Sequence, residues 1–524
     1  SLLREFYKNS GYADVEIKSA VAQLDRNKEG FNIIFTISEG KKYNYGQIKI
    51  LSNINDIDTD LIFKNLIIDE GDTYSAGKIE KTIKFITNLV NEQGFPFTET
   101  VPEVERINKS NKIAVIFRIN ESDKKYINKI SIIGNDRTLD KVIRRKIRLA
   151  EGDAFVPSLV ARSKTLIGNL GFFSSLNIME VPSTKLGYTD IVVEVSETST
   201  GEVSFGGGYS SQAGGILNLG VTEKNFLGRG QRVAINSKFS QRESDYTASF
   251  SEPNLFNRDL YSSFNIYNNS VDHKESRYDL KRQGLNISGS FSLSEYWRQS
   301  VRYSLENRDL TTRDGVSASI RAEQGQTALS ELSTSISVDT TNNSMAPSAG
   351  YDVSLASALA GIGGDKQFIR ICNNGNYYKS FNDESIILGF GYNSGIIIGL
   401  GQDILISDRY FLGGNSFKGF DQSGVGPRDS TSKDSLGGNL YYTGTIKATF
   451  GIGLPPELGV RGNWYTTFGS LTGIDKNTAA YKDDGSIRLS TGVGVSWNSP
   501  FGPISIIISE ALLKEDYDIT EAVS

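Results

Sequence analysis

The chain has 524 residues, of which 38% are hydrophobic and 22% are charged, and its formal net charge is −5. This composition excludes a disordered chain, and the negative charge argues against a general nucleic-acid binder. No run approaches the 18 apolar residues of a membrane-spanning helix, whereas a transmembrane β-barrel is not excluded because its strands alternate apolar and polar residues.

Cysteine and histidine occur once each, as Cys372 and His273. A disulfide framework, a Cys/His metal site and a Cys/His nucleophile are therefore excluded, and we predict no metal, no cofactor and no catalytic residue. The chain has neither an initiator Met nor a signal peptide, so we expect it to be a fragment of a longer, processed protein.

The first 199 residues repeat one pattern. Three alternating strand-like runs end at Glu39, Glu121 and Glu197, which are separated by 82 and 76 residues. Between them, residues 78–91 place four apolar side chains on one helical face, namely Ile79, Ile83, Ile86 and Val90. Each repeat is read as β-α-α-β-β. We predict the end of one repeat at 1–41, whole repeats at 42–122 and 123–199, and a separate domain at 200–524.

The composition changes at that last boundary, because residues 1–200 carry only 12 of the 53 Gly. The later part consists of alternating runs. In ESIILGFGYN (384–393), Ile386, Leu388, Phe390 and Tyr392 share one face, and small or polar residues occupy the other. A face of small and polar residues suits the wet interior of a transmembrane barrel. GIGGDK (361–366) and GVGPRD (424–429) lack the Lys-Ser/Thr ending of a phosphate-binding loop and are interpreted as turns.

Fifteen strands are predicted in this domain, from GEVSFGGGYS (201–210) to GPISIIISEALL (502–513). An odd number leaves an unpaired edge, which is not tolerated in lipid. We therefore expect a sixteenth strand that is missing after the tail KEDYDITEAVS.

Five segments carry a family resemblance. They are TEKNFLGRG (222–230), DTTNNSMAPSAGY (339–351), SDRYFLGGNSFKGFDQSGVGPRD (407–429), SLGGNLYYTGTIKATFGIGLP (435–455) and SWNSPFGPI (496–504). Together with the repeats, the whole chain resembles the BamA family of outer-membrane barrel-assembly insertases. The resemblance implies α+β periplasmic POTRA domains, five in a complete member, followed by a 16-stranded antiparallel transmembrane β-barrel. The GPRD element and the tail favour this family over TamA-like or two-partner secretion translocators, which remain the alternative.

The resemblance also assigns candidate site residues. The family's sixth extracellular loop carries a Val-Arg-Gly-Phe/Tyr tip, which here reads Phe417, Lys418, Gly419 and Phe420, and its flanks are Gly413, Gly414, Gly426, Pro427, Arg428 and Asp429. The strand proposed to receive the loop's Arg reads Tyr465, Thr467 and Gly469, with Thr467 at the position of an Asp. A Lys–Thr contact is weaker than a bidentate Arg–Asp pair, so Lys418 is expected to use another acceptor. The interleaved Phe and Gly residues of 401–437 predict a loop that packs inside the barrel.

Gly206, Gly207 and Gly208 lie in the first barrel strand, which by resemblance pairs with the last strand to form a lateral gate. Glycine weakens a strand, so these residues keep the seam easy to open. Two other interpretations stay open, in which the glycines fill a crowded interior or permit a bend.

The implied function is folding and insertion of β-barrel proteins by strand templating at this gate. The resemblance implies unfolded outer-membrane proteins, accessory lipoproteins of the BAM type, periplasmic chaperones and outer-membrane lipids as partners. It places the barrel in the outer membrane of a Gram-negative bacterium and the repeats in the periplasm. Two other classes of outer-membrane protein fit the sequence less well. An enzyme would need an acid and a nucleophile beside His273, which is expected in an outer loop. A passive porin would not need the N-terminal repeats.

Overall fold

The computed structural model describes residues 2–24, 31–107, 110–122, 124–344, 346–381, 385–455, 458–476, 478, 480–499 and 502–523. It forms two compact units, Ser1–Ser199 and Thr200–Ser524, which are described separately. Parts of the predicted segments lie outside the described residues, namely Met345, Glu384, Pro500 and Phe501. No helix in the described part is long and apolar enough to cross a membrane.

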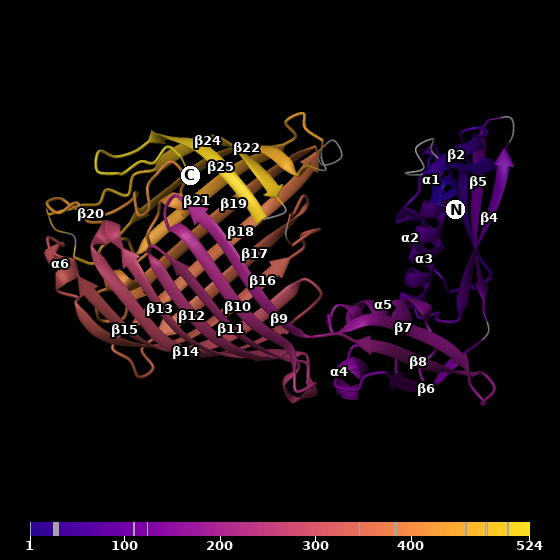
Figure 1. The fold of residues 1–524 in the computed structure, drawn as a ribbon, viewed down its shortest axis with the longest axis horizontal. Coiled ribbons are helices and arrows are strands. Elements are labelled where there is room, and N and C mark those ends of the chain that lie inside the picture. Colours follow the sequence, from indigo (N-terminus) through magenta and orange to yellow (C-terminus); the bar gives the residue numbers. More distant parts are fainter. Residues whose placement is uncertain are drawn as a thin grey trace. The chain divides into compact units, whose positions relative to one another are not determined.

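The first unit contains two complete β-α-α-β-β repeats, as predicted (Figure 1). They are β3 (Asn44–Ser52), α2 (Thr59–Lys64), α3 (Ala76–Glu92), β4 (Thr98–Ile107) and β5 (Lys112–Glu121), then β6 (Tyr126–Ile133), α4 (Asp140–Arg144), α5 (Pro157–Gly168), β7 (Phe173–Pro182) and β8 (Tyr188–Glu197). Before them lie α1 (Leu2–Asn9), β1 (Glu16–Leu24) and β2 (Phe31–Ser38). Domain limits at residues 42 and 123 stay a prediction.

Each complete repeat builds its own sheet and core. The sheets have the orders β3-β5-β4 and β6-β8-β7, with a parallel first pair and an antiparallel second pair. α3 begins at a serine cap, where Ser75 Oγ accepts a hydrogen bond from the Lys78 N–H at 3.3 Å. Its buried face contains Ile79, Ile86 and Val90, which confirms the predicted helix.

The basic run 141–148 does not form one continuous helix, because α4 ends at Arg144. The chain then continues in turns, where Lys146 and Ile147 donate to carbonyls three residues earlier. Burial of both Ile143 and Leu149 in the core explains the bend, because a continuous helix would not deliver both side chains to the same sheet.

The second unit is a 15-stranded antiparallel sheet that curls into a barrel-shaped wall (Figure 1). Its strands are β9 (Gly201–Ser210), β10 (Gly214–Phe226), β11 (Gln231–Ser240), β12 (Glu243–Glu252), β13 (Leu260–His273), β14 (Tyr278–Ser292), β15 (Trp297–Thr312), β16 (Gly325–Asp339), β17 (Gly350–Ala360), β18 (Phe368–Phe381), β19 (Ile386–Gly399), β21 (Leu440–Phe450), β22 (Val460–Thr472), β24 (Arg488–Ser499) and β25 (Gly502–Leu513). A separate pair joins β20 (Arg428–Asp429) to β23 (Tyr481–Lys482), and α6 spans Ala318–Arg321.

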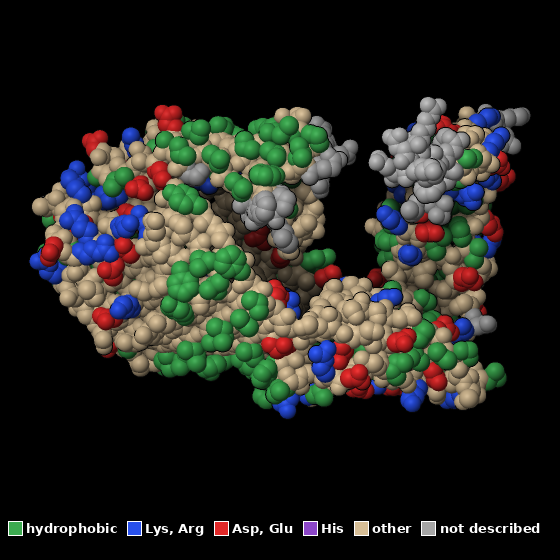
Figure 2. All heavy atoms as spheres, viewed as in Figure 1, with side chains coloured by type: hydrophobic (Ala, Val, Ile, Leu, Met, Phe, Trp, Pro, Cys, Tyr) green, Lys and Arg blue, Asp and Glu red, His purple; other side chains and the backbone are tan. Residues whose placement is uncertain are grey.

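The two faces of the sheet differ as the alternation predicts. On β19, Ile386, Leu388 and Phe390 are exposed on the outer face. Figure 2 shows hydrophobic side chains gathered over the outer surface of β9 and β10 and of the last strands. An outward apolar band over a polar inner face is the pattern of a transmembrane barrel. The predicted fold class, repeats followed by this barrel-type sheet, is confirmed.

The sheet ends in two edges, β9 and β25. β9 pairs with β10, and β25 pairs with β24. The tail returns to β25, where Ile508 and Val523 form an antiparallel bridge and the Ser509 N–H donates to the Ala522 carbonyl at 2.8 Å. An antiparallel bridge of this kind is how a further strand would pair with β25. The sixteenth strand itself stays a prediction.

Candidate functional site

The first candidate is the glycine run on the edge strand β9. An added Cβ at Gly206 or Gly208 would have no neighbour within 4 Å, and one at Gly207 would meet only the Ile216 carbonyl at 3.7 Å. The interpretation that these glycines fill a crowded interior is therefore wrong. A soft edge or a bend remains, because glycine lowers the order of a strand without needing a close neighbour.

The second candidate is the segment 401–437 between β19 and β21, called here the inner loop. At its tip, Phe417 and Phe420 are 0% and 1% exposed, and their rings meet edge to face with centroids 5.0 Å apart. They pack against three further buried side chains, which are Leu412, Val425 and Leu471 of β22. An apolar cluster on the inner side of the wall therefore holds the tip.

Three glycines permit close approach at this tip. Gly413, Gly414 and Gly419 all have positive φ angles, of 137°, 55° and 89°. A Cβ at Gly419 would lie 2.9 Å from the Cβ of Ser490 in β24, and a Cβ at Gly414 would overlap the side chain of Gln212 in the β9–β10 turn. The tip therefore contacts the wall near both edge strands, at the β9–β10 turn beside β9 and at β24 beside β25. Gly413, Gly414 and Gly419 require glycine because of their backbone angles.

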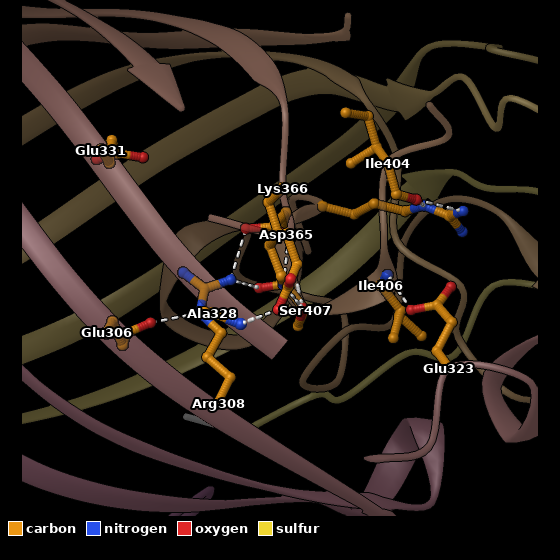
Figure 3. A network of polar contacts seen from close by, with 12 residues as sticks. Glu306, Arg308, Glu323, Ala328, Glu331, Asp365, Lys366, Ile404, Ile406 and Ser407 are labelled. Carbon is orange, nitrogen blue, oxygen red and sulfur yellow. Dashed lines mark hydrogen bonds and ion pairs between the residues drawn. The ribbon is translucent and has the colours of Figure 1, made fainter. Parts of the chain in front are cut away.

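A buried charge cluster fixes the base of the loop. Asp408, whose side chain is 1% exposed, receives Arg308 Nη1 of β15 at 2.5 Å and Lys366 Nζ of the β17–β18 turn at 2.7 Å. Figure 3 shows Arg308 and Lys366 converging on the loop beside Ser407, with Glu306 pairing with Arg308 from the other side. Arg370 of β18 adds a third cation, 3.6 Å from the carboxylate.

The electrostatics of this cluster favour the charged carboxylate. Burial raises the pKa of Asp408, but Arg308 and Lys366 outweigh it and hold this pKa below its ordinary value. Burial lowers the pKa of Lys366 below its ordinary value and repulsion from Arg308 lowers it further, whereas attraction to Asp408 offsets only part of this shift. The negative charge of Asp408 therefore compensates the buried positive charges of Arg308 and Lys366.

The flank of the loop is also buried. Arg428, 2% exposed, donates to the carbonyls of Lys433 at 3.0 Å and Ser423 at 2.5 Å. Asp429 accepts from the backbone of Thr431 and Ser432 and from the hydroxyl of Ser317. The flank also contains Pro427, whose carbonyl accepts from the Leu436 N–H, and Gly426, whose φ is 104°. These groups close the turn on itself, so they shape the loop rather than present a free site.

The tail after β25 binds the same loop. The Asp421 N–H donates to the Ile519 carbonyl at 2.9 Å, and the Ile519 N–H donates to the Gly424 carbonyl at 3.0 Å. Arg488 of β24 pairs with Asp518 at 2.9 Å, and the two side chains are 1% and 0% exposed. The inner loop, the tail and the last hairpin therefore form one hydrogen-bonded unit.

Lys418 does not find the acceptor expected of it. Within the described part of the chain, its ammonium group has neither a hydrogen bond nor an ion pair. The hydroxyl of Thr467 pairs with that of Thr445 at 3.0 Å instead. Tyr465 and Thr467 line the same cavity as Lys418, whereas Gly469 lies against the backbone of β21, where a Cβ would overlap the Tyr442 carbonyl.

His273 does not lie in an outer loop as expected, because it ends β13. Its ring stacks on Tyr278 with centroids 4.5 Å apart. The neighbouring Asp272 pairs with Arg313 at 2.7 Å. The arrangement therefore joins His273 to an aromatic ring and Asp272 to a cation, and it does not form an acid–base pair.

Known proteins resemble both units. The Omp85 superfamily domain model matches residues 225–524, and the POTRA model, described as a surface antigen variable number repeat, matches 43–122 and 125–198. The outer membrane protein assembly factor BamA of Neorickettsia risticii is 31% identical, covering 100% of this chain and 70% of that protein. BamA from Haemophilus ducreyi lacking POTRA domains 1–3 is 20% identical with a TM-score of 0.71, covering 92% of this chain and 98% of that one. CdiB from Acinetobacter baumannii is 14% identical with a TM-score of 0.53, covering 92% and 88%.

Proposed function

Because the chain belongs to the Omp85 superfamily and is an outer membrane protein assembly factor, we propose that it folds and inserts β-barrel proteins by templating their strands at β9. Its sheet lies in the outer membrane of a Gram-negative bacterium and its POTRA units lie in the periplasm. The mechanism, the substrates and the partners are part of this proposal.

The observation that carries the proposal is the edge strand β9. In the described part of the sheet it pairs on one side with β10, so its other edge presents backbone donors and acceptors to an incoming strand. Val203, Phe205 and Tyr209 are 81%, 77% and 82% exposed on its outer face. A substrate strand that paired there would receive both a hydrogen-bond template and an apolar face toward lipid.

The POTRA units act in the proposal as the receiving surface. β4 and β7 lie at the edges of their sheets and offer extended backbone to unfolded outer-membrane proteins delivered by periplasmic chaperones. Accessory lipoproteins of the BAM type bind the same part of the chain. No covalent step is required, since insertion runs downhill on the folding free energy of the substrate, and we propose that the protein is not an enzyme.

Insertion kinetics test the proposal. The protein expressed from its complete gene is reconstituted in liposomes, and insertion of a urea-unfolded outer-membrane barrel is followed by protease protection. We expect acceleration over empty liposomes. A folded protein that gives no acceleration with its lipoproteins present would refute the insertase role and favour a secretion translocator of the same superfamily.

Valine substitution then tests the edge strand itself. Gly206→Val and Gly208→Val are expected to slow insertion while the sheet still forms, because neither added side chain meets a neighbour. Gly289→Val in β14 is the matched control, since its Cβ would meet only Leu260 at 3.7 Å and its strand is paired on both sides. Equal rates for the edge and control variants would remove β9 as the template.

A further inference from the structure

A cavity of about 230 Å³ lies between the tip of the inner loop and the last strands of the sheet. It has room for several water molecules, each of which occupies about 30 Å³. Lys418 of the loop and Lys447 of β21 both line it. Among the described residues around this lysine cavity there is no Asp or Glu.

Neither lysine is neutralised by a residue that the structure describes. At the base of this loop, by contrast, the buried wall cations Arg308 and Lys366 pair with the carboxylate of Asp408. In the described residues, the ammonium groups of Lys418 and Lys447 have neither an ion pair nor a hydrogen bond. Two like charges that face one space repel each other, and an anion between them removes that repulsion.

The rest of the lining supplies neutral hydrogen-bond donors. The hydroxyls of Thr445 and Thr467 lie 3.0 Å apart, so one donates to the other and the second keeps its own proton free. The Asn463 amide donates to Ser496 Oγ at 2.9 Å, which fixes the opposite wall. Two cations beside a free hydroxyl donor match the acceptor oxygens of an oxyanion.

The position of the cavity restricts the source of that anion. Lys447 and Tyr465 face each other in the sheet register and point to the inner side, whereas Ile446 and Trp464, one residue earlier, are exposed on the outer face. The cavity opens on the inner side of the sheet, away from the apolar outer face, which favours a water-soluble anion over a membrane lipid.

We propose that the lysine cavity binds a soluble oxyanion of the phosphate class, which bridges Lys418 of the inner loop to Lys447 of the wall. Bound there, the anion supplies the counter-charge that the described lining lacks and fastens the loop tip to β21. The tip contacts β24 through Gly419, so the anion also strengthens the wall next to β25. This inference does not rest on insertase activity, and its failure leaves the proposed function unchanged.

Binding of inorganic phosphate to the detergent-solubilised protein tests the proposal. Titration is followed by ³¹P line broadening and by the thermal unfolding midpoint, with chloride at equal ionic strength as the reference. We expect phosphate to raise the midpoint and Lys418→Met or Lys447→Met to weaken binding about tenfold or more, since a hydrogen bond to a charged group is worth about 1.5–3 kcal/mol. Lys476→Met, at an exposed lysine paired with Asp403, is the matched control and should bind as the parent does.

A gain of charge separates binding from a merely structural effect. Thr467→Asp would place a carboxylate on the wall of the cavity, and we expect it to abolish phosphate binding while raising the midpoint measured in chloride. No phosphate-dependent shift in the parent protein would overturn the proposal. An equal shift in the Lys418→Met/Lys447→Met double variant would overturn it as well, because binding would then lie elsewhere.

Discussion

Asp408→Asn is the sharpest test of how the inner loop is held. The substitution keeps the shape of the side chain but removes the charge that Arg308 and Lys366 share. Both cations would then stay in the wall, where their side chains are 8% and 3% exposed, with a neutral amide between them. The loss is therefore larger than that of one hydrogen bond.

The magnitude follows from burial. Removing one partner of a buried ion pair costs about 3–5 kcal/mol, because the other charge stays buried without compensation. Glu306 next to Arg308 and Glu331 next to Arg370 offset part of this cost, so we expect a value near the lower end of that range. Neutralisation of the single carboxylate of Asp408 is therefore expected to loosen the whole inner loop, residues 401–437.

Two measurements check this expectation. Thermal unfolding of the detergent-solubilised protein gives the change in stability, and limited trypsin digestion reports release of the loop at Lys418 and Arg428. Both residues are shielded in the parent, since Lys418 is half-buried and Arg428 is buried. We expect Asp408→Asn to lower the unfolding midpoint and to expose both cleavage sites.

Asp403→Asn is the matched control, because it removes the same charge from the same loop. Asp403 pairs with Lys476, and these side chains are 44% and 80% exposed, so little change is expected. The double variant Asp408→Asn/Lys366→Met should recover part of the loss, since it removes one of the uncompensated cations. If Asp408→Asn is no less stable than Asp403→Asn and its loop resists trypsin, the cluster does not anchor the loop.

Three further predictions concern the tip, the edge and the first unit. Phe420→Ala should cost about 3–5 kcal/mol and expose the loop to trypsin, and a protected loop would contradict the apolar anchoring. Gly206→Val should slow insertion with an unchanged unfolding midpoint, and an unchanged rate would contradict the soft edge. Burial raises the pKa of Glu197, but hydrogen bonds from Thr138 and Arg137 outweigh it and lower this pKa. The stabilisation by ionised Glu197 is therefore fully present above about pH 4.3, the ordinary pKa of Glu, and is lost as the pH falls through the lowered pKa. Glu197→Gln should flatten the dependence of the unfolding midpoint on pH in this acidic range. An unaltered pH profile would refute this role.

The strands were predictable because their signal is local. β9 and β25 have the limits predicted from sequence, 201–210 and 502–513, since each alternates in period two between turn-forming residues. Inward packing of Phe417 and Phe420 follows from aromatic residues interleaved with glycine, a pattern that a solvated loop does not need. Both inferences require only neighbours in the sequence.

The charge cluster was not predictable for the opposite reason. Asp408 lies 100 residues from Arg308 and 42 residues from Lys366, and no spacing rule links the three. The segment containing Lys366 reads as a turn, which it is, but its lysine points to Asp408 of the inner loop. Lys418 shows the same limit, because the sequence predicted an acceptor other than Thr467 but could not identify one, and among the described residues its ammonium group has no partner.

The positions of these anchors relate stability to function. Arg308 lies on β15, a strand paired on both sides, and Lys366 lies in the turn before the doubly paired β18, so the base of the loop is fixed to the interior of the sheet and not to its edges. Its tip reaches the β9–β10 turn and β24, next to the two edges. In the proposed mechanism, a base fixed in this way would let β9 separate while the loop stays docked.

This arrangement predicts two separable classes of variant. Substitutions at Asp408 or Phe420 should change the unfolding midpoint more than the insertion rate measured well below that midpoint. Substitutions at Gly206 and Gly208 should do the reverse, because they stiffen an edge strand that is paired on one side only in the described sheet. Insertion rates plotted against unfolding midpoints for the four single variants would show the two classes as separate groups. A single line through all four would mean that insertion depends only on overall stability, and the loop and the edge would then have no distinct roles.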